Sequence, residues 1–271
     1  MVGPDVKGAR VILFNADDKL KFIGCEIIYR EACKLAAESP LRVDVEFFPK
    51  GLHDLERTDM LARLQEAVDR IGREAGYRAI LLGYARCNDG LAGLTARSVP
   101  LVIPKAHDCI TFFFGSRSSF QRYFDAHPGT YYHTTGWMER DNPEVTGSQG
   151  VMSKLGLDQD YEQLVAKYGK ENADFIAETM GGGLQHYDRI CYLEMDVTDE
   201  RAFIERSRQE AERNGWTFDL RKGEWSLLER LFRGEWEGGD FLMVPPGHRI
   251  VARNDGEVLG VVKDREDADA A

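Results

Sequence analysis

Short apolar runs that alternate with segments of helical period are the feature that most constrains the fold of this chain. The runs are continuous rather than alternately apolar and polar, which is typical of strands in a parallel sheet covered on both faces. In the first half, the predicted helices are 26–39 and 59–76, the latter ending at Gly76. The predicted strands there are 21–25, 43–49, 79–84 and 100–104, with an extra edge strand at 10–15.

The second half repeats this order, with predicted strands at 189–196, 216–220 and 240–247 and predicted helices at 200–215 and 224–234. Residues 158–182, between the halves, also have a helical pattern. We therefore expect an α/β fold of two β-α-β-α-β halves, with mostly parallel, doubly wound sheet and a helical connection. The expected domains are 1–150, 151–188 and 189–271, arranged either as two lobes or as one continuous sheet.

The charge of the chain argues against two classes of partner. Its 35 Lys and Arg against 46 Asp and Glu give a net charge of −11, which repels nucleic acid and anionic membrane surfaces. No run approaches the ~18 apolar residues of a membrane span, and the N-terminus lacks the apolar core of a secretory signal. We expect a cytoplasmic protein that acts on a small-molecule substrate.

Three of the five cysteines follow predicted strands of the first half. Cys25 is the last residue of the predicted strand 21–25. Cys87 lies three residues after the strand 79–84, and Cys109 lies five residues after the strand 100–104. Ligands of open parallel sheets bind at the carboxyl ends of the strands, where the strand order reverses. The three thiols are therefore predicted to meet in one crevice, although buried cysteine also serves as simple core filler. Cys33 and Cys191 do not share this placement.

The loop after the fourth strand adds an imidazole, a carboxylate and an amine to this crevice. It reads Lys105-Ala106-His107-Asp108-Cys109, and its His-x-Cys spacing allows one turn to supply two ligands to a metal. We predict that Cys25, Cys87 and Cys109 hold a zinc ion, with His107 as an alternative ligand or a base and with Asp108 and Lys105 as catalytic groups. The same three cysteines would also suit an iron–sulfur cluster with one open iron. Alternatively, the loop is a surface turn in which Asp108 caps the next helix.

Polar residues near the predicted crevice are candidates for substrate binding. Ser116 and Arg117 open a predicted helix, where backbone N–H groups attract anions, although Ser116 is also an ordinary helix cap. Asn88 follows Cys87, and His248 follows the last predicted strand. The aromatic segment 131–137 is either a substrate wall or core around His133, and we favour core. Walker A, G-x-G-x-x-G, G-x-S-x-G and H-E-x-x-H patterns do not occur.

Residues 81–117 resemble the signature of an uncharacterised prokaryotic family, number 1638 among the domains of unknown function. Their sequence is LLGYARCNDGLAGLTARSVPLVIPKAHDCITFFFGSR. The blocks FIGCEIIYRE (22–31), GLH (51–53), TYYHTTGW (130–137) and GEWEGGDFLMVPPG (234–247) are also similar to blocks of that family. One departure is the sequence Ala85-Arg86-Cys87-Asn88, where relatives more often have a glycine beside the cysteine. The resemblance implies a link to corrinoid-dependent methyl transfer by association only.

Taken together, the cysteine placement predicts a zinc-dependent enzyme, and the family resemblance implies that it transfers a methyl or other one-carbon group, with a corrinoid protein as a partner. Two alternatives remain open from the sequence. One is an iron–sulfur lyase or redox enzyme that uses the same three cysteines. The other is a non-catalytic protein that binds a metal or a corrinoid.

Overall fold

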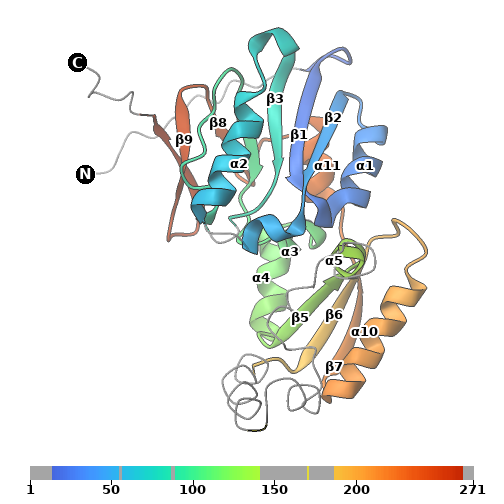
Figure 1. Ribbon diagram of the computed structural model, residues 1–271. Coiled ribbons are helices and arrows are strands. Elements are labelled where there is room, and N and C mark those ends of the chain that lie inside the picture. Colours follow the sequence, from blue (N-terminus) through green and yellow to red (C-terminus); the bar gives the residue numbers. More distant parts are fainter. Residues whose placement is uncertain (1–13, 55–56, 87–88, 141–169, 171–185, 265–271) are drawn as a thin grey trace. The chain divides into compact units, whose positions relative to one another are not determined.

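The computed structural model describes residues 14–54, 57–86, 89–140, 170 and 186–264 (Figure 1). Each of the two compact units of the chain contains a parallel sheet whose strands are connected by helices, which confirms the predicted α/β fold. Unit 1 consists of Met1–Cys25, Ala32–Phe112 and Ser226–Ala271, and unit 2 consists of Glu26–Glu31 and Phe113–Trp225.

Unit 1 is built on a five-stranded sheet with the order β2-β1-β3-β4-β8. The first four strands are mutually parallel, whereas β8 pairs antiparallel with β4. The chain order therefore reverses between β1 and β3, as in doubly wound sheets. The strands are β1 (Lys19–Cys25), β2 (Arg42–Phe48), β3 (Tyr77–Gly83), β4 (Leu101–Pro104) and β8 (Phe241–Val244).

The central strands of this sheet are buried because helices cover both faces, with α2 over one and α11 over the other (Figure 1). Phe232 of α11 packs against Phe22 of β1, with ring centroids 4.9 Å apart. Burial of each such large apolar side chain contributes roughly 1.5–3 kcal/mol. The helices connected to this sheet are α1 (Tyr29–Glu38), α2 (Arg57–Asp69) and α11 (Ser226–Arg233).

A β-hairpin that the sequence analysis did not predict completes unit 1. Its strands are β9 (His248–Ala252) and β10 (Leu259–Lys263), which pair antiparallel. Ile250, Val258 and Leu259 of this hairpin are buried, so its apolar side chains belong to the core of unit 1.

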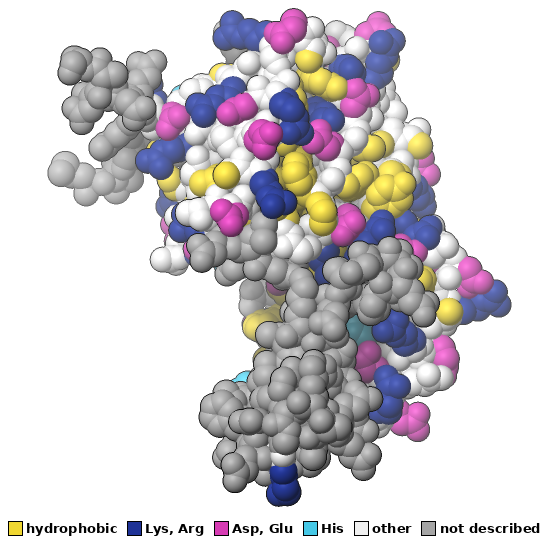
Figure 2. Space-filling model, viewed as in Figure 1, with side chains coloured by type: hydrophobic (Ala, Val, Ile, Leu, Met, Phe, Trp, Pro, Cys, Tyr) yellow, Lys and Arg dark blue, Asp and Glu magenta, His cyan; other side chains and the backbone are white. Residues whose placement is uncertain are grey.

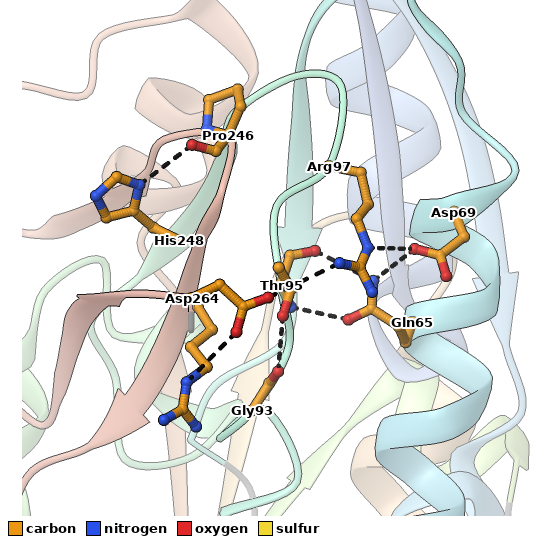
Figure 3. Close-up of polar contacts among 9 residues, drawn as sticks. Gln65, Asp69, Gly93, Thr95, Arg97, Pro246, His248 and Asp264 are labelled. Carbon is orange, nitrogen blue, oxygen red and sulfur yellow. Dashed lines mark hydrogen bonds and ion pairs between the residues drawn. The ribbon is translucent and has the colours of Figure 1, made fainter. Parts of the chain in front are cut away.

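A polar network connects α2 to the hairpin (Figure 3). The side-chain amide of Gln65 accepts a hydrogen bond from the backbone N–H of Thr95 (2.8 Å) and donates one to the Thr95 carbonyl (3.1 Å). Arg97 lies between two carboxylates, 3.0 Å from Asp69 and 3.8 Å from Asp264. These contacts hold together segments that are distant in the sequence.

Unit 2 contains a three-stranded sheet with the order β5-β6-β7, in which both pairs are parallel. Its main helices pack on this sheet: the Tyr123 hydroxyl of α4 donates a hydrogen bond to Asp219 of β7 (2.7 Å), and the guanidinium of Arg208 in α10 lies over the Phe218 ring. The elements are β5 (Thr130–Thr134), β6 (Arg189–Glu194), β7 (Thr217–Lys222), α4 (Arg117–Ala126), α5 (Thr135–Arg140) and α10 (Arg201–Asn214).

Short helices connect the longer elements of both units. None of the helices in the described ranges is long and apolar enough to cross a membrane. The short helices are η1 (Glu26–Ile28), η2 (Lys50–Asp54), η3 (Arg73–Ala75) and α3 (Ile110–Phe113).

The pairing of two strands crosses the boundary between the two predicted β-α-β-α-β halves. β8, predicted to close the second half, instead pairs with β4, whose four residues are all buried and would otherwise form an open sheet edge. β5, from the first half, joins β6 and β7. The two units are therefore interleaved along the chain and do not coincide with the expected domains 1–150, 151–188 and 189–271.

Two predicted elements cannot be compared with the structure. The predicted helix at 158–182 lies outside the described residues apart from Lys170, and most of the predicted edge strand at 10–15 does so as well. Phe14 and Asn15, which are described, belong to no strand.

Basic and acidic side chains are mixed over the face of unit 1 that Figure 2 shows. Ion pairs also join adjacent strands of the sheet, since Lys19 of β1 lies 2.8 Å from Asp44 of β2 and Lys21 lies 2.9 Å from Glu46.

Candidate functional site

The carboxyl edge of β1, β3 and β4 in unit 1 is the candidate site that the sequence predicts. These three strands are adjacent and parallel, so their carboxyl ends lie at one edge of the sheet. Cys25 is the last residue of β1, and Cys109 lies five residues after the end of β4. Strand spacing of about 4.8 Å separates β1 from β4 by roughly 10 Å across β3. In a shared metal site, the loop after β4 would therefore have to bring Cys109 back towards β3.

The two described cysteines of this edge differ in exposure. Cys25 is buried, with 7% of its surface exposed, and its backbone lies in register with Phe48 of β2. Cys109 is half-buried, and its carbonyl accepts a hydrogen bond from the N–H of Phe112 (3.1 Å). Cys87 and Asn88, which follow β3, lie outside the described residues.

The structure narrows the choice of metal ligands. Within the described part of the chain, no three His, Cys, Asp or Glu side chains lie close enough together to hold a metal ion. A site made from Cys25 and Cys109 with His107 as the third ligand is therefore not formed, and the His107 side chain is exposed. A metal at this edge would consequently need at least one ligand from outside the described residues, and Cys87 is the one that the sequence predicts.

Asp108 caps the short helix α3, as the alternative interpretation of the loop expected. Its carboxylate accepts hydrogen bonds from the backbone N–H of Thr111 (3.2 Å) and from the Thr111 hydroxyl (3.4 Å). Burial raises the pKa of Asp108, whereas these hydrogen bonds and one from the Ile110 backbone oppose that rise. Asp108 thus has a structural role that holds the backbone next to Cys109.

Lys105 also has a partner in unit 1. Its ammonium group forms an ion pair with Glu257, and its side chain is only 12% exposed. The backbone N–H of Lys105 donates a hydrogen bond to the carbonyl of Asp240 (2.7 Å). These contacts connect the loop after β4 to the residue that precedes β8 and to the turn between β9 and β10. They leave Lys105 poorly placed to bind a substrate anion.

Arg86 connects the loops at this edge, a role that the sequence analysis missed. Its side chain pairs with Asp89 and donates hydrogen bonds to the Arg253 carbonyl (2.9 Å) and to Asn254 (3.2 Å). Its backbone N–H donates to the carbonyl of Ala106 (2.9 Å). Arg86 therefore links the residues immediately before Cys87 to the loop after β4 and to the hairpin.

The remaining predicted substrate-binding residues have ordinary structural contacts. Ser116 is the N-cap of α4, and its hydroxyl accepts a hydrogen bond from the N–H of Ser119 (3.1 Å). Arg117 is the first residue of that helix and, like Ser116, belongs to unit 2. His248 begins β9 in unit 1, where Nδ1 lies 3.2 Å from the Pro246 carbonyl oxygen (Figure 3).

A comparison with protein families identifies the chain. Residues 47–232, more than half of the 271, match the family model described as "Protein of unknown function (DUF1638)". The chain belongs to the DUF1638 family. No curated protein and no solved structure matches it. The family match includes Cys87 and Cys109, whereas Cys25 precedes it.

Unit 2 of this DUF1638 protein contains a second candidate site that the sequence analysis missed. It is a pocket of about 400 Å³ lined by side chains that include three arginines: Arg30, Arg140 and Arg206. No sequence pattern identifies these residues, because they are far apart in the chain and are brought together only by the packing of α5, α10 and the start of α1.

His133 and Cys191 of unit 2 are core residues. His133 is buried in β5, where Nδ1 lies 2.8 Å from the hydroxyl of Ser207, and burial lowers its pKa to about 4. Burial also raises the pKa of the Cys191 thiol to about 12. The imidazole is therefore neutral and the thiol protonated near pH 7.

Proposed function

We propose that this DUF1638 protein is a metal-thiolate enzyme in which Cys25, Cys87 and Cys109 hold a zinc ion. In this proposal, the enzyme transfers a methyl or other one-carbon group to a small-molecule substrate. The observation that supports it best is the strand order β2-β1-β3-β4, since it brings the three strands that precede these cysteines side by side. Cys25 and Cys109 follow the two strands that flank β3, and Cys87 follows β3 itself.

The donor atoms fit zinc in their chemistry. Zinc accepts thiolate ligands, and three protein ligands leave its fourth position open, as in catalytic zinc sites. A zinc ion bound there would supply a Lewis acid that lowers the pKa of a substrate thiol, amine or water.

The groups of the chain itself hold the ligands in place. Cys25 is fixed by the hydrogen-bonded end of β1, and the capping of α3 by Asp108 orients the backbone next to Cys109. Arg86, the residue before Cys87, is held against the loop after β4 because its backbone N–H donates a hydrogen bond to the Ala106 carbonyl. We assign Lys105 to the structure of this loop because of its ion pair with Glu257.

The family resemblance suggests a methylated corrinoid as the donor of the methyl group. In the proposed transfer to a thiol, the thiol loses its proton, the new sulfur–carbon bond forms, and the cobalt–carbon bond breaks with its electron pair left on cobalt. The products are a thioether, a proton and a cobalt(I) corrinoid, which balances atoms and electrons.

Metal analysis of the protein purified without oxygen or chelator tests the proposal. We expect one zinc per chain, and we expect Cys25→Ser, Cys87→Ser and Cys109→Ser each to lose most of it. Cys33→Ser in α1 and Cys191→Ser in β6 are matched controls, because neither cysteine lies at the carboxyl edge of the sheet. Both controls should retain the metal.

Three results would contradict the proposal. If the parent contained no stoichiometric metal, or if Cys33→Ser lost as much metal as the three site variants, the proposed zinc site would be wrong. Iron with sulfide and absorption near 400 nm would replace zinc with an iron–sulfur cluster and one-carbon transfer with lyase or redox chemistry. Bound zinc without any transfer from methylcobalamin to a thiol would leave a metal-binding protein instead of an enzyme of this kind.

A further inference from the structure

The pocket of about 400 Å³ in unit 2 is lined by residues of three helices. Tyr29 and Arg30 line it from the start of α1, Met138 and Arg140 from α5, and Phe203 and Arg206 from α10. All of these residues belong to unit 2, so the pocket is complete within one unit. Its volume is in the range of pockets that bind small molecules.

The pocket is at the edge of a parallel sheet where ligands usually bind. α5 follows the carboxyl end of β5 directly, and α10 follows that of β6 after a short loop. Gly136 allows α5 to approach η1, because a Cβ at this position would lie 1.8 Å from the carbonyl oxygen of Ile27. The absence of a side chain there brings the start of α1 close to α5 and forms one wall of the pocket.

The charged side chains of the pocket leave an excess of positive charge. Arg30 is neutralised by Glu139, with Nη2 and Oε1 separated by 2.6 Å. Arg140 forms an ion pair with Glu26, with Nε and Oε2 separated by 3.5 Å, although this buried Nε makes no hydrogen bond to any group in the described residues. A buried N–H group of this kind normally has an acceptor. The excess positive charge is therefore that of Arg206.

Arg206 is the second guanidinium with unused hydrogen-bonding capacity. It forms no ion pair and no hydrogen bond within the part of the chain that the structure describes, and its side chain is exposed. Arg140 and Arg206 together therefore present N–H donors to an anion that this pocket could hold. Guanidinium groups suit carboxylates and phosphates because they bind two oxygens of one group at once.

The other lining residues are apolar or aromatic. Tyr29 supplies an exposed ring over which the Arg140 guanidinium lies at 5.5 Å, and Met138 is buried beneath. Phe203 adds a second ring from α10. Such walls favour a ligand with an apolar or planar body attached to the anionic group.

We propose that this pocket binds a small organic anion, a carboxylate or phosphate ester with an apolar body, through Arg140 and Arg206. The proposal is independent of the metal site, because it uses residues of unit 2 alone. It also explains how a chain with a net charge of −11 can attract an anion, since the attraction is local.

Titration calorimetry of the full chain with four probes tests this assignment. Phenyl phosphate and benzoate carry the anion and the apolar body, inorganic phosphate lacks the body, and benzyl alcohol lacks the charge. We expect saturable one-to-one binding of phenyl phosphate or benzoate, and the tighter of the two identifies the anionic group. Inorganic phosphate and benzyl alcohol should bind at least about tenfold more weakly.

Two charge-neutralising variants locate the site. Arg206→Gln should weaken binding at least about tenfold, because hydrogen bonds to charged groups contribute that much to affinity. It should not affect folding, since Arg206 has no partner in the described residues. Arg122→Gln is the matched control, because Arg122 lies in α4 and lines a different pocket of unit 2.

Three outcomes would overturn the assignment. The first is no saturable binding of phenyl phosphate or benzoate at millimolar concentration. The second is an equal loss of affinity in Arg206→Gln and Arg122→Gln, which would show only general attraction by positive charge. The third is binding of inorganic phosphate as tight as that of phenyl phosphate, which would exclude a role for the apolar walls.

Discussion

Glu31, in the first turn of α1, is a fully buried carboxyl group without a hydrogen-bond partner from another residue in the described part of the chain. Burial is the main cause that raises its pKa to about 7; the nearby carboxylates of Glu200 and Glu139 contribute to this rise, whereas its own backbone N–H and Arg30 oppose it. Glu31 is therefore partly protonated at neutral pH and loses its proton as the pH rises.

The pH dependence of stability gives the first prediction. In the unfolded chain Glu31 has an ordinary pKa of about 4.5, so between pH 4.5 and 7 the folded state binds more protons than the unfolded state. The contribution of this group to stability therefore falls as the pH rises through that window, by roughly 3 kcal/mol in total. Glu31→Gln should remove this loss and make the protein more stable than the parent above pH 7.

Urea unfolding of the parent and Glu31→Gln between pH 4.5 and 8 measures this effect. The difference in the free energy of unfolding should increase with pH and level off above pH 7. Glu38→Gln, at the exposed end of the same helix, should show no such difference. Parallel pH profiles for the parent and Glu31→Gln would show that Glu31 titrates normally in the folded protein.

Asp108 and α3 provide a prediction at the scale of an element. The cap on α3 consists of two hydrogen bonds to Thr111, and an asparagine side chain can make the same bonds through its carbonyl oxygen. Asp108→Ala should therefore reduce the free energy of unfolding by about 1 kcal/mol. Asp108→Asn should be nearly neutral.

The same pair of variants separates a structural role from a catalytic one. If Asp108 acts only as a cap, Asp108→Asn should retain both the stability and the metal content of the parent. Denaturant midpoints and metal analysis of the two variants provide the comparison. An equal loss of stability in both variants would mean that the charge of Asp108, rather than its oxygen, stabilises the loop.

The elements that the sequence predicted well are those with a strong local signal. β1, β3 and β4 lie within two residues of their predicted positions, because each is a continuous apolar run bounded by turn residues. The hairpin of β9 and β10 was missed because its strands mix apolar and charged residues. The turn sequence Asn254-Asp255-Gly256 between them was a usable signal.

The sequence predicted those features of the candidate sites that depend on strand order, but not those that depend on contacts between distant side chains. Placement of Cys25 and Cys109 at one sheet edge followed from strand order. The ion pair of Lys105 with Glu257 joins residues that are 152 positions apart, and no local pattern predicts it. The same reason explains why the three arginines of the unit 2 pocket were not recognised from the sequence.

At the scale of the whole molecule, the two sheets predict a pattern of amide hydrogen exchange. Amides of β1, β3 and β4 are paired on both sides and buried, and β6 is the central strand of the second sheet. β2 and β7 are edge strands with mostly exposed or half-buried residues. Because the slowest exchange reports the most stable part of a structure, we expect it in the central strands.

Exchange measured by mass spectrometry of peptides from the native protein checks this expectation. Peptides of β3 and β6 should remain protected longest in their units, and those of β2 and β7 should exchange earlier. Equal protection of β7 and β6 would indicate that another part of the chain covers the outer edge of β7.

The late position of β8 in the chain affects how the protein is synthesised. Residues 241–244 leave the ribosome after all of the segment Phe113–Trp225 that makes up most of unit 2. Until then, β4 is an unpaired and entirely apolar edge in the nascent chain, and such edges promote association with other strands. A ribosome that stalls before residue 241 therefore leaves a product with this edge open, whereas release of residues 241–244 from the ribosome allows β8 to close it.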